Sequence, residues 1–436
     1  MHKFIKWIVF PLTGVLLLTL VMTWYTGYQV DRRLGDWVSR ADQVPGIATS
    51  WFDLEKNLFT RKAELHLLIA EPATLLTLVP SLNGDNRLQN WLQRQGTIDL
   101  YIEIRHSIVP GFVQGTAQIN MQRSSFADLP EKLNIPHDIY WNINSYSGNI
   151  VAGLNMAQWS WFRDEQTWLV SPLRVRAGFA DTEHIDLSVF WQGMEWRNDD
   201  NEEQGKLADL TLDSQLVVNH GLWLMPQAKL NLGLLELRQP DRQLQLQQWH
   251  WLTDISENSD GLLSVVDVNS HSNIKRLSYT SRQNDYLLSD LKAGFALGGV
   301  NREGVEALLM NSGLDAANAA KWKAGLNLIT RSGVHFRLDP FNLQLNRQPV
   351  SVHGQLTTRP FDVAQVHEIE SMRSLLQGDV SVVIARTLAQ QFASAPEVLP
   401  DLLTDGYLEQ NAAGDISTKI RMVNGKLSAN GVAVPY

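Results

Sequence analysis

The sequence of 436 residues contains no cysteine. This absence excludes disulfides, thiol nucleophiles and the zinc or iron–sulfur sites that use cysteine ligands. It also suits an oxidising compartment, because no thiol can mispair there. The chain has no basic stripe either, and its formal net charge is −9. Proteins that bind nucleic acid neutralise phosphates with clustered Lys and Arg, so we expect no nucleic-acid partner.

The familiar catalytic patterns are also absent. The sequence has no Gly-x-Ser-x-Gly elbow and no phosphate-binding loop, and its eleven histidines include no pair spaced as in a helical zinc site. Three histidines within strand patterns, His66, His250 and His335, are expected to be hydrogen-bonded structural residues. The sequence therefore predicts no catalytic residue, no cofactor and no metal. A pair of carboxylates that meets only in the folded chain stays open as an alternative.

Charged residues are missing from one long segment near the N-terminus. No Asp, Glu, Lys or Arg lies between Lys6 and Asp31. A membrane-spanning helix needs about 20 apolar residues, and no small-x-small cleavage site follows this run. We therefore predict an uncleaved transmembrane anchor over residues 7–30, after a cytoplasmic tail over residues 1–6. The residues expected to meet the membrane, with aromatic side chains at the two interfaces, are Trp7, Leu16, Leu17, Leu18, Leu20, Trp24 and Tyr25.

Flanking charge does not decide the orientation of this anchor. Lys3 and Lys6 precede it, and Arg32, Arg33 and Arg40 follow it. The short tail is typical of a signal anchor, so we expect the N-terminus inside and the bulk of the chain outside. Residues 31–43 are predicted to form a juxtamembrane amphipathic helix that ends at Pro45-Gly46, because apolar residues recur at helical spacing.

The rest of the chain alternates mostly with a period of two. Segments 47–55 and 59–69 predict a hairpin, and residues 98–105 predict a strand with one buried and one wet face. We divide this part into a β-rich region over residues 44–295 and an α+β region over residues 296–436. In the second region, helices are expected over 302–310 and 317–330. Asn424-Gly425 there predicts a tight hairpin, since both residues tolerate positive φ. The predicted fold class is α+β, mainly β, with long, curved, antiparallel sheets and peripheral helices.

Two strands in the middle of the chain change phase. Leu230 and Leu232 have the opposite parity to Leu235 and Leu237, and a second strand behaves likewise. Such a slip indicates a β-bulge, which adds twist and bends a sheet. The tryptophans are expected to pack against sheet faces rather than form a sugar-binding platform. The candidate apolar sheet face comprises Leu230, Leu232, Leu244, Leu246, Trp249 and Trp251.

Several segments together resemble a known family. These are Trp24-Tyr25-Thr26-Gly27 at the end of the anchor, the hairpin from Ser50-Trp51-Phe52-Asp53 to Leu58-Phe59-Thr60-Arg61, and the ending from Lys419 to Gly431. The order of helices and hairpins in residues 300–400 also fits. On these residues the chain resembles the YdgA family of Gram-negative envelope proteins. Relatives often have a His-Gly-Pro turn where this chain reads His106-Ser107-Ile108-Val109-Pro110-Gly111. The resemblance implies an inner-membrane protein that faces the periplasm, and it implies no reaction.

Three functional hypotheses follow. The first is a non-enzymatic envelope module whose curved, Leu- and Trp-rich sheet binds a lipid, another apolar ligand or a partner protein. The second is a structural or assembly protein that forms homo-oligomers through its juxtamembrane helix and exposed strand edges. The third is a periplasmic hydrolase whose site assembles only in the fold. In each case the membrane is an expected partner.

Overall fold

The chain divides into two compact units. Unit 1 comprises Met1–Arg163, Thr167–Gly193 and Leu216–Trp223, and unit 2 comprises Asp164–Gln166, Met194–Gln215 and Leu224–Tyr436. The computed structural model describes residues 2–56, 61–74, 90, 92–106, 111–120, 123–124, 137–144, 147, 149–163, 165–179, 184–198, 200–219, 222–260, 263–310, 316–363, 374–393 and 397–435. The region boundaries that the sequence suggests rest on composition and pattern, and they stay a prediction.

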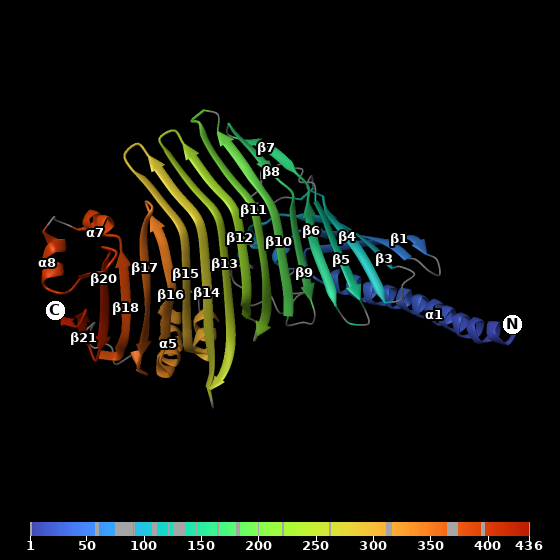
Figure 1. The fold of residues 1–436 in the computed structure, drawn as a ribbon. Helices are drawn as coiled ribbons and strands as arrows, with labels where there is room; N and C mark the ends of the chain where they lie inside the picture. Colours follow the sequence, from blue (N-terminus) through green and yellow to red (C-terminus); the bar gives the residue numbers. More distant parts are fainter. Residues whose placement is uncertain are drawn as a thin grey trace. The chain divides into compact units, whose positions relative to one another are not determined.

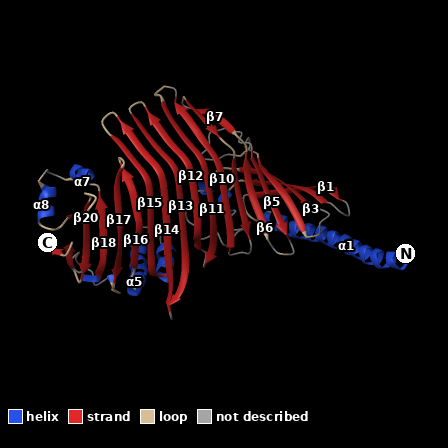
Figure 2. Ribbon diagram, viewed as in Figure 1, coloured by secondary structure: helices blue, strands red, loops and turns tan. Residues whose placement is uncertain are grey.

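Strands make up most of the described chain, as Figure 2 shows, which confirms a mainly β, antiparallel fold. In unit 1, antiparallel pairing runs in the order β1–β2–β3–β4–β5–β6–β9–β10. The bounds of these strands are β1 Ile47–Lys56, β2 Arg61–Ile69, β3 Ile98–His106, β4 Phe112–Ile119, β5 His137–Asn144, β6 Ile150–Met156, β9 Leu173–Phe179 and β10 His184–Asn198. Two short strands, β7 (Trp159–Arg163) and β8 (Gln166–Val170), lie between β6 and β9 in the sequence. The predicted early hairpin is β1–β2.

Unit 2 contains the longest strands. They are β11 (Glu203–Asn219), β12 (Leu222–Gln239), β13 (Arg242–Asp260), β14 (Leu263–Ser281) and β15 (Asp285–Asn301), followed by β16 (His335–Leu345), β17 (Gln348–Thr358) and β18 (Leu376–Ile384). The ending comprises β19 (Glu409–Gln410), β20 (Ile416–Val423), β21 (Lys426–Ala429) and β22 (Val432–Ala433). Antiparallel pairing is continuous from β12 to β18 and then passes to β20 and β21.

The helices of unit 2 confirm two of the expected segments. Helix α4 spans Arg302–Met310 and helix α5 spans Ala316–Ser332, and α7 (Arg386–Phe392) and α8 (Val398–Thr404) follow later. The predicted Asn-Gly hairpin is also confirmed. Asn424 and Gly425 have φ angles of 50° and 76°, and they join β20 to β21 as a turn with two positive φ angles.

A single helix, α1 (His2–Ala41), spans both the predicted anchor and the predicted amphipathic helix. It ends before Pro45, where Asp42 Oδ1 accepts hydrogen bonds from the backbone N–H and the hydroxyl of Thr49. Ala41 then packs with Ile47, Leu67 and Ile69 in a buried cluster. These contacts fix the end of the helix to the start of the sheet (Figure 1).

The anchor prediction is tested only in part. No helix in the described part of the chain is long and apolar enough to cross a membrane. The side chains of Trp7, Leu16, Leu17, Leu18 and Leu20 lie outside the described residues. The transmembrane segment therefore stays a prediction.

Further along α1, small and polar residues face the sheet of unit 1. Thr23 is 0% exposed and Thr26 is 7% exposed. The Thr26 hydroxyl donates to the carbonyl of Met22 and accepts from the N–H of Gly111 at 3.0 Å. A Cβ at Gly27 would lie only 2.8 Å from Nε2 of His106, so glycine allows the helix to approach β3 closely. One face of α1 is thus packed on β3 and β4.

The long strands of unit 2 contain a backbone irregularity in one row, that is, among residues that lie opposite one another across neighbouring strands. In Figure 1 these strands bend part-way along their length. Asp209 in β11, Gln248 in β13 and Asp290 in β15 have φ angles of 56°, 50° and 51°. Asp209 lies beside Gly233 of β12. In β13, Trp249 and Gln247 are each paired with a residue of β12 and a residue of β14, whereas Gln248 between them is skipped in both pairings. The positive φ angles therefore fall in alternate strands of the same row.

This row explains the phase change and corrects the predicted mechanism for it. A β-bulge adds a residue to one strand and shifts the register. The register of β12 and β13 is unchanged from Gln227↔Asp254 to Gln239↔Arg242. The change in the alternation of side chains instead occurs where residues of this row have left-handed backbone conformations. It occurs at the same row in neighbouring strands. The leucines on each side of the slip therefore still meet each other across the strands.

We predict that Gln248→Val destabilises the protein more than Gln247→Val. A β-branched residue at positive φ costs about 1–3 kcal/mol, whereas position 247 pairs regularly with Leu234 and Arg276. Gln248→Gly should tolerate the left-handed conformation and keep the wild-type Tm. Thermal unfolding followed by circular dichroism measures the three values. Equal decreases in Tm for Gln248→Val and Gln247→Val would contradict the positive φ angle at Gln248.

Candidate functional site

The residues of the candidate apolar sheet face come together across β12 and β13 of unit 2. Leu230 pairs with Trp251 and Leu232 with Trp249, on one side of the irregular row. On the other side, Leu246 pairs with Leu235 and Leu244 with Leu237. All six residues of the candidate face thus have an apolar cross-strand partner, which is the arrangement that stabilises sheets most effectively.

The face extends into the next two strands. Ile274 of β14 and Leu291 of β15 continue the row of Trp249, and Leu277 and Leu288 continue the row of Leu246. Leu232 is 6% exposed, whereas Leu237 at the margin is 40% exposed. The other side chains of these two rows are half-buried in the described structure. A broad Leu- and Trp-rich surface therefore keeps partial contact with solvent.

The two tryptophans are hydrogen-bonded within the sheet. The indole N–H of Trp249 donates to Oγ of Ser272, and that of Trp251 donates to Oγ of Ser270, both at 2.9 Å. Both serines belong to β14, so each ring reaches diagonally over the neighbouring strand. Because the N–H groups are satisfied internally, the rings offer apolar surface and require no polar ligand atom.

Polar groups line the alternate positions of the same strands. Asn231 donates to the hydroxyl of Thr211 at 2.8 Å and accepts from Nδ1 of His250 at 2.7 Å. His250 and Asn273 are exposed, and they pair with each other across β13 and β14. Since side chains alternate between faces along a strand, the sheet has a polar face and an apolar face here.

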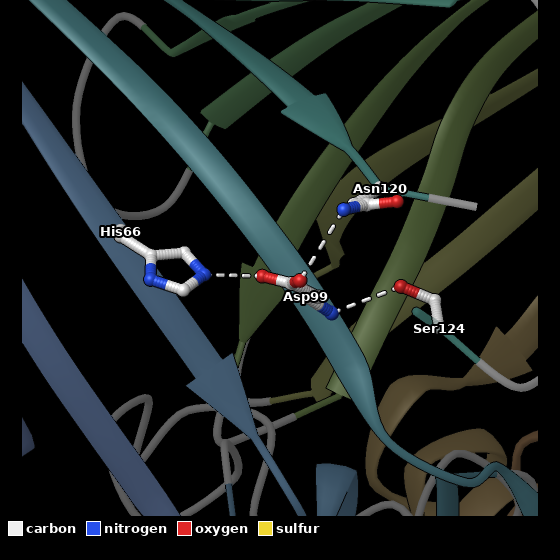
Figure 3. Close-up of polar contacts among 4 residues, drawn as sticks. All are labelled: His66, Asp99, Asn120 and Ser124. Carbon is white, nitrogen blue, oxygen red and sulfur yellow. Dashed lines mark hydrogen bonds and ion pairs between the residues drawn. The ribbon is translucent and has the colours of Figure 1, made fainter. Parts of the chain in front are cut away.

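A second polar cluster lies in unit 1 around Asp99 (Figure 3). Nε2 of His66 hydrogen-bonds Oδ1 of Asp99 at 2.5 Å, and the Asp99 side chain is 1% exposed. The amide of Asn120 donates to Oδ2 of Asp99 at 3.5 Å, and the His66 ring stacks on Tyr101 with centroids 4.6 Å apart. The prediction of a wet face for β3 is wrong at Asp99, because His66 on β2 and the residues after β4 cover it.

The Asp99 cluster contains a serine but not the geometry of a serine hydrolase. Ser124 Oγ accepts a hydrogen bond from the backbone N–H of Asp99 at 2.9 Å. Figure 3 draws no contact between Ser124 and His66. A catalytic serine needs a base within hydrogen-bond reach of its hydroxyl. Sequence patterns did not point to Asp99, since its partners come from two other segments, β2 and the residues after β4.

The three strand histidines that we expected to be structural are all hydrogen-bonded. His66 bonds Asp99, His250 bonds Asn231, and Nδ1 of His335 lies 3.2 Å from the hydroxyl of Thr357. This confirms the prediction for these residues. In the part of the chain that the structure describes, no group of three or more His, Asp or Glu side chains is placed to hold a metal ion.

A family model described as a bacterial protein of unknown function, DUF945, matches residues 1–436. The chain belongs to the DUF945 family. Comparison of this DUF945 protein with curated proteins and with solved structures gave no match. The family carries no assigned reaction or ligand, and the narrower resemblance to YdgA-like envelope proteins stays a prediction.

The two candidate anchor residues within the described side chains are exposed. Trp24 is 56% exposed and Tyr25 is 49% exposed, and Val21 and Tyr28 on the same helix are 59% and 52% exposed. These four residues have the spacing i, i+3, i+4 and i+7, so they form one stripe. It consists of aromatic and apolar side chains, whereas Thr23 and Thr26 on another face are buried.

We predict that Asp99→Ala lowers the free energy of unfolding by about 1–3 kcal/mol, because it removes the buried carboxylate that Nε2 of His66 and the amide of Asn120 bond. Asp138→Ala is the matched control, since Asp138 is exposed. Its effect should stay within about 0.5 kcal/mol. Chemical denaturation of both variants gives the comparison. If Asp138→Ala costs as much as Asp99→Ala, the cluster has no special structural role.

Proposed function

We propose that this DUF945 protein is a non-enzymatic, membrane-tethered module of the bacterial envelope that binds the acyl chains of a lipid on the apolar face of β12–β15. The observation that carries the proposal is the pair of tryptophans whose indole N–H groups are bonded to Ser270 and Ser272. A face whose polar atoms are satisfied internally favours a ligand without hydrogen-bonding groups, and acyl chains are such a ligand.

The extent of the face supports a long ligand. Apolar rows recur along the strands, from the row of Leu244 and Leu237 to the row of Trp251 and Leu230. Exposed apolar surface of this continuity is unfavourable in water, and it normally marks a binding surface. We prefer a lipid to a protein partner because the indole N–H groups of this face are already bonded within the sheet, whereas a protein interface typically adds about ten hydrogen bonds to its apolar core.

Attachment to the membrane is the second part of the proposal. The 24 residues from Trp7 to Val30 are uncharged, which suits a single-pass anchor with the bulk of the chain in the periplasm. Because the sheet of unit 1 covers one face of α1 at Thr23 and Thr26, we place the end of the fully lipid-surrounded part near Met22. Trp24, Tyr25 and Tyr28 then lie at the level of the headgroups.

Site-specific photo-crosslinking tests the lipid face. A benzophenone amino acid at Leu237 should cross-link lipid in intact bacterial membranes, because Leu237 is exposed at the margin of the apolar face. The same probe at the adjacent exposed Arg238, which points to the opposite face and pairs with Glu236, should give no lipid adduct. Mass spectrometry of the adducts identifies the cross-linked species. Equal lipid adducts from both positions, or only protein adducts from Leu237, would overturn the proposal.

Alkaline carbonate extraction tests the anchor. The full-length protein should remain in the membrane pellet. The double variant Leu17→Arg with Leu18→Arg should appear in the supernatant, since each Arg at the centre of a membrane helix costs about 2.5–3.5 kcal/mol. Gly35→Arg, at an exposed position of α1, is the matched control and should stay in the pellet. A wild-type protein released by carbonate would rule out a transmembrane anchor.

A further inference from the structure

An apolar cavity of about 480 Å³ lies within unit 1, between α1 and the sheet. Met22, Val30 and Leu34 line it from the helix, and Ile104, Val113 and Trp141 line it from β3, β4 and β5. This volume is within the range of about 300–1,000 Å³ that is usual for sites of small ligands. Every lining residue belongs to unit 1, so the cavity does not depend on the placement of unit 2.

The residues of β4 explain why a hollow forms there. Ile104, Gly115 and Trp141 lie in one row of β3, β4 and β5. A Cβ at Gly115 would lie 2.1 Å from the Trp141 ring, so the indole lies across β4 where no side chain stands. Above this floor, α1 is fixed by the contact of Gly27 with His106 and by the bond from Gly111 to Thr26. The helix thus bridges a floor on which the Trp141 ring lies flat over Gly115 and no side chain rises from β4 at that position.

The rim of the cavity is cationic. Arg33 lines it and is exposed, and no ion pair to Arg33 occurs among the residues that the structure describes. From Met22 to Arg33 the helix rises about 16 Å, at about 1.5 Å per residue. An apolar hollow of that length with a guanidinium group at one end matches the chemistry of a phospholipid, since an acyl chain fits the first and a phosphate fits the second.

The helix itself indicates where such a lipid comes from. The residues of α1 that line the cavity lie in the last part of the uncharged run that we propose as the anchor and just after it. On the outside of the same turns, Val21, Trp24 and Tyr28 are exposed, and Tyr25 is exposed at the mouth of the cavity, which is the composition of a helix at a membrane interface. The cavity would therefore open beside the bilayer, where phospholipid is present at high local concentration.

We propose that this cavity holds one acyl chain of a phospholipid taken from the adjoining bilayer, with the lipid phosphate bound by Arg33. The proposal rests on the membrane attachment proposed above, but it concerns a site separate from the apolar face of unit 2. Bound in this way, the lipid would fill the space between α1 and β3–β5, and the sheet of unit 1 would be held at the membrane surface.

Native mass spectrometry of the full-length protein tests the site. The protein is reconstituted in nanodiscs of phosphatidylethanolamine and phosphatidylglycerol and then released into mild detergent. The wild type should retain phospholipid. Val113→Trp and Leu34→Phe, which fill the cavity from the sheet and from the helix, should each lose one retained lipid per chain. Gln114→Trp is the matched control, because Gln114 is exposed on the other face of β4, and it should retain lipid as the wild type does. Arg33→Gln should reduce retention of phosphatidylglycerol.

The outcomes separate this site from the proposed function. If the wild type holds no lipid, or if both filled variants retain as much as Gln114→Trp, the cavity is not a lipid site. Circular dichroism establishes that each filled variant is folded, and the two substitutions on different elements guard against a local defect. Loss of lipid adducts at Leu237 with normal behaviour of the filled variants would overturn the unit 2 face alone. If alkaline carbonate releases the wild type from the membrane, but Val113→Trp and Leu34→Phe still lose their lipid, only the anchor proposal is overturned.

Discussion

Antiparallel pairing of successive strands is the constraint on which the rest of this structure depends. It satisfies the backbone of each long strand with its neighbours in the sequence, and it places alternate residues on opposite faces. In unit 2 this gives rows such as Leu232, Trp249, Ile274 and Leu291 on one face. Asn231 and His250 occupy the alternate positions. A sheet built in this way is amphipathic.

The irregular row changes the phase of β12 and β13 without disturbing their pairing. A bulge in one strand would have moved that strand out of register with both neighbours, and the leucines on the far side would have lost their partners. Left-handed residues at Asp209, Gln248 and Asp290 lie in alternate strands of one row, and the register from β12 to β15 is unchanged across this row. On the other side of Asp290, the pairing of β15 with β16 does shift register. The apolar pairs Leu246–Leu235 and Leu244–Leu237 therefore continue the surface past the row in β12 and β13.

In unit 1 the same sheet geometry meets a helix with an unusual distribution of side chains. The face of α1 that contacts the protein contains Thr23, Thr26 and Gly27, and the face that is exposed contains Trp24 and Tyr28. A helix of a water-soluble domain normally has the reverse arrangement. The arrangement is physically reasonable if lipid meets the exposed face, and it links the anchor, the cavity beside β4 and the sheet in one proposal.

Local pattern determined much of this protein from the sequence by itself. Period-two alternation predicted the mainly β fold, and helical spacing predicted α4 and α5. Asn424-Gly425 predicted its hairpin, because the tolerance of positive φ is a local property of these residues. Tertiary structure alone decided three things. The burial of Asp99 depends on His66 from β2 and on Asn120 and Ser124 from the segment after β4. The unchanged register at Gln248 depends on neighbouring strands that slip together. The cavity depends on the position of α1 above Gly115, and no single segment encodes it, since it requires the helix and three strands at once.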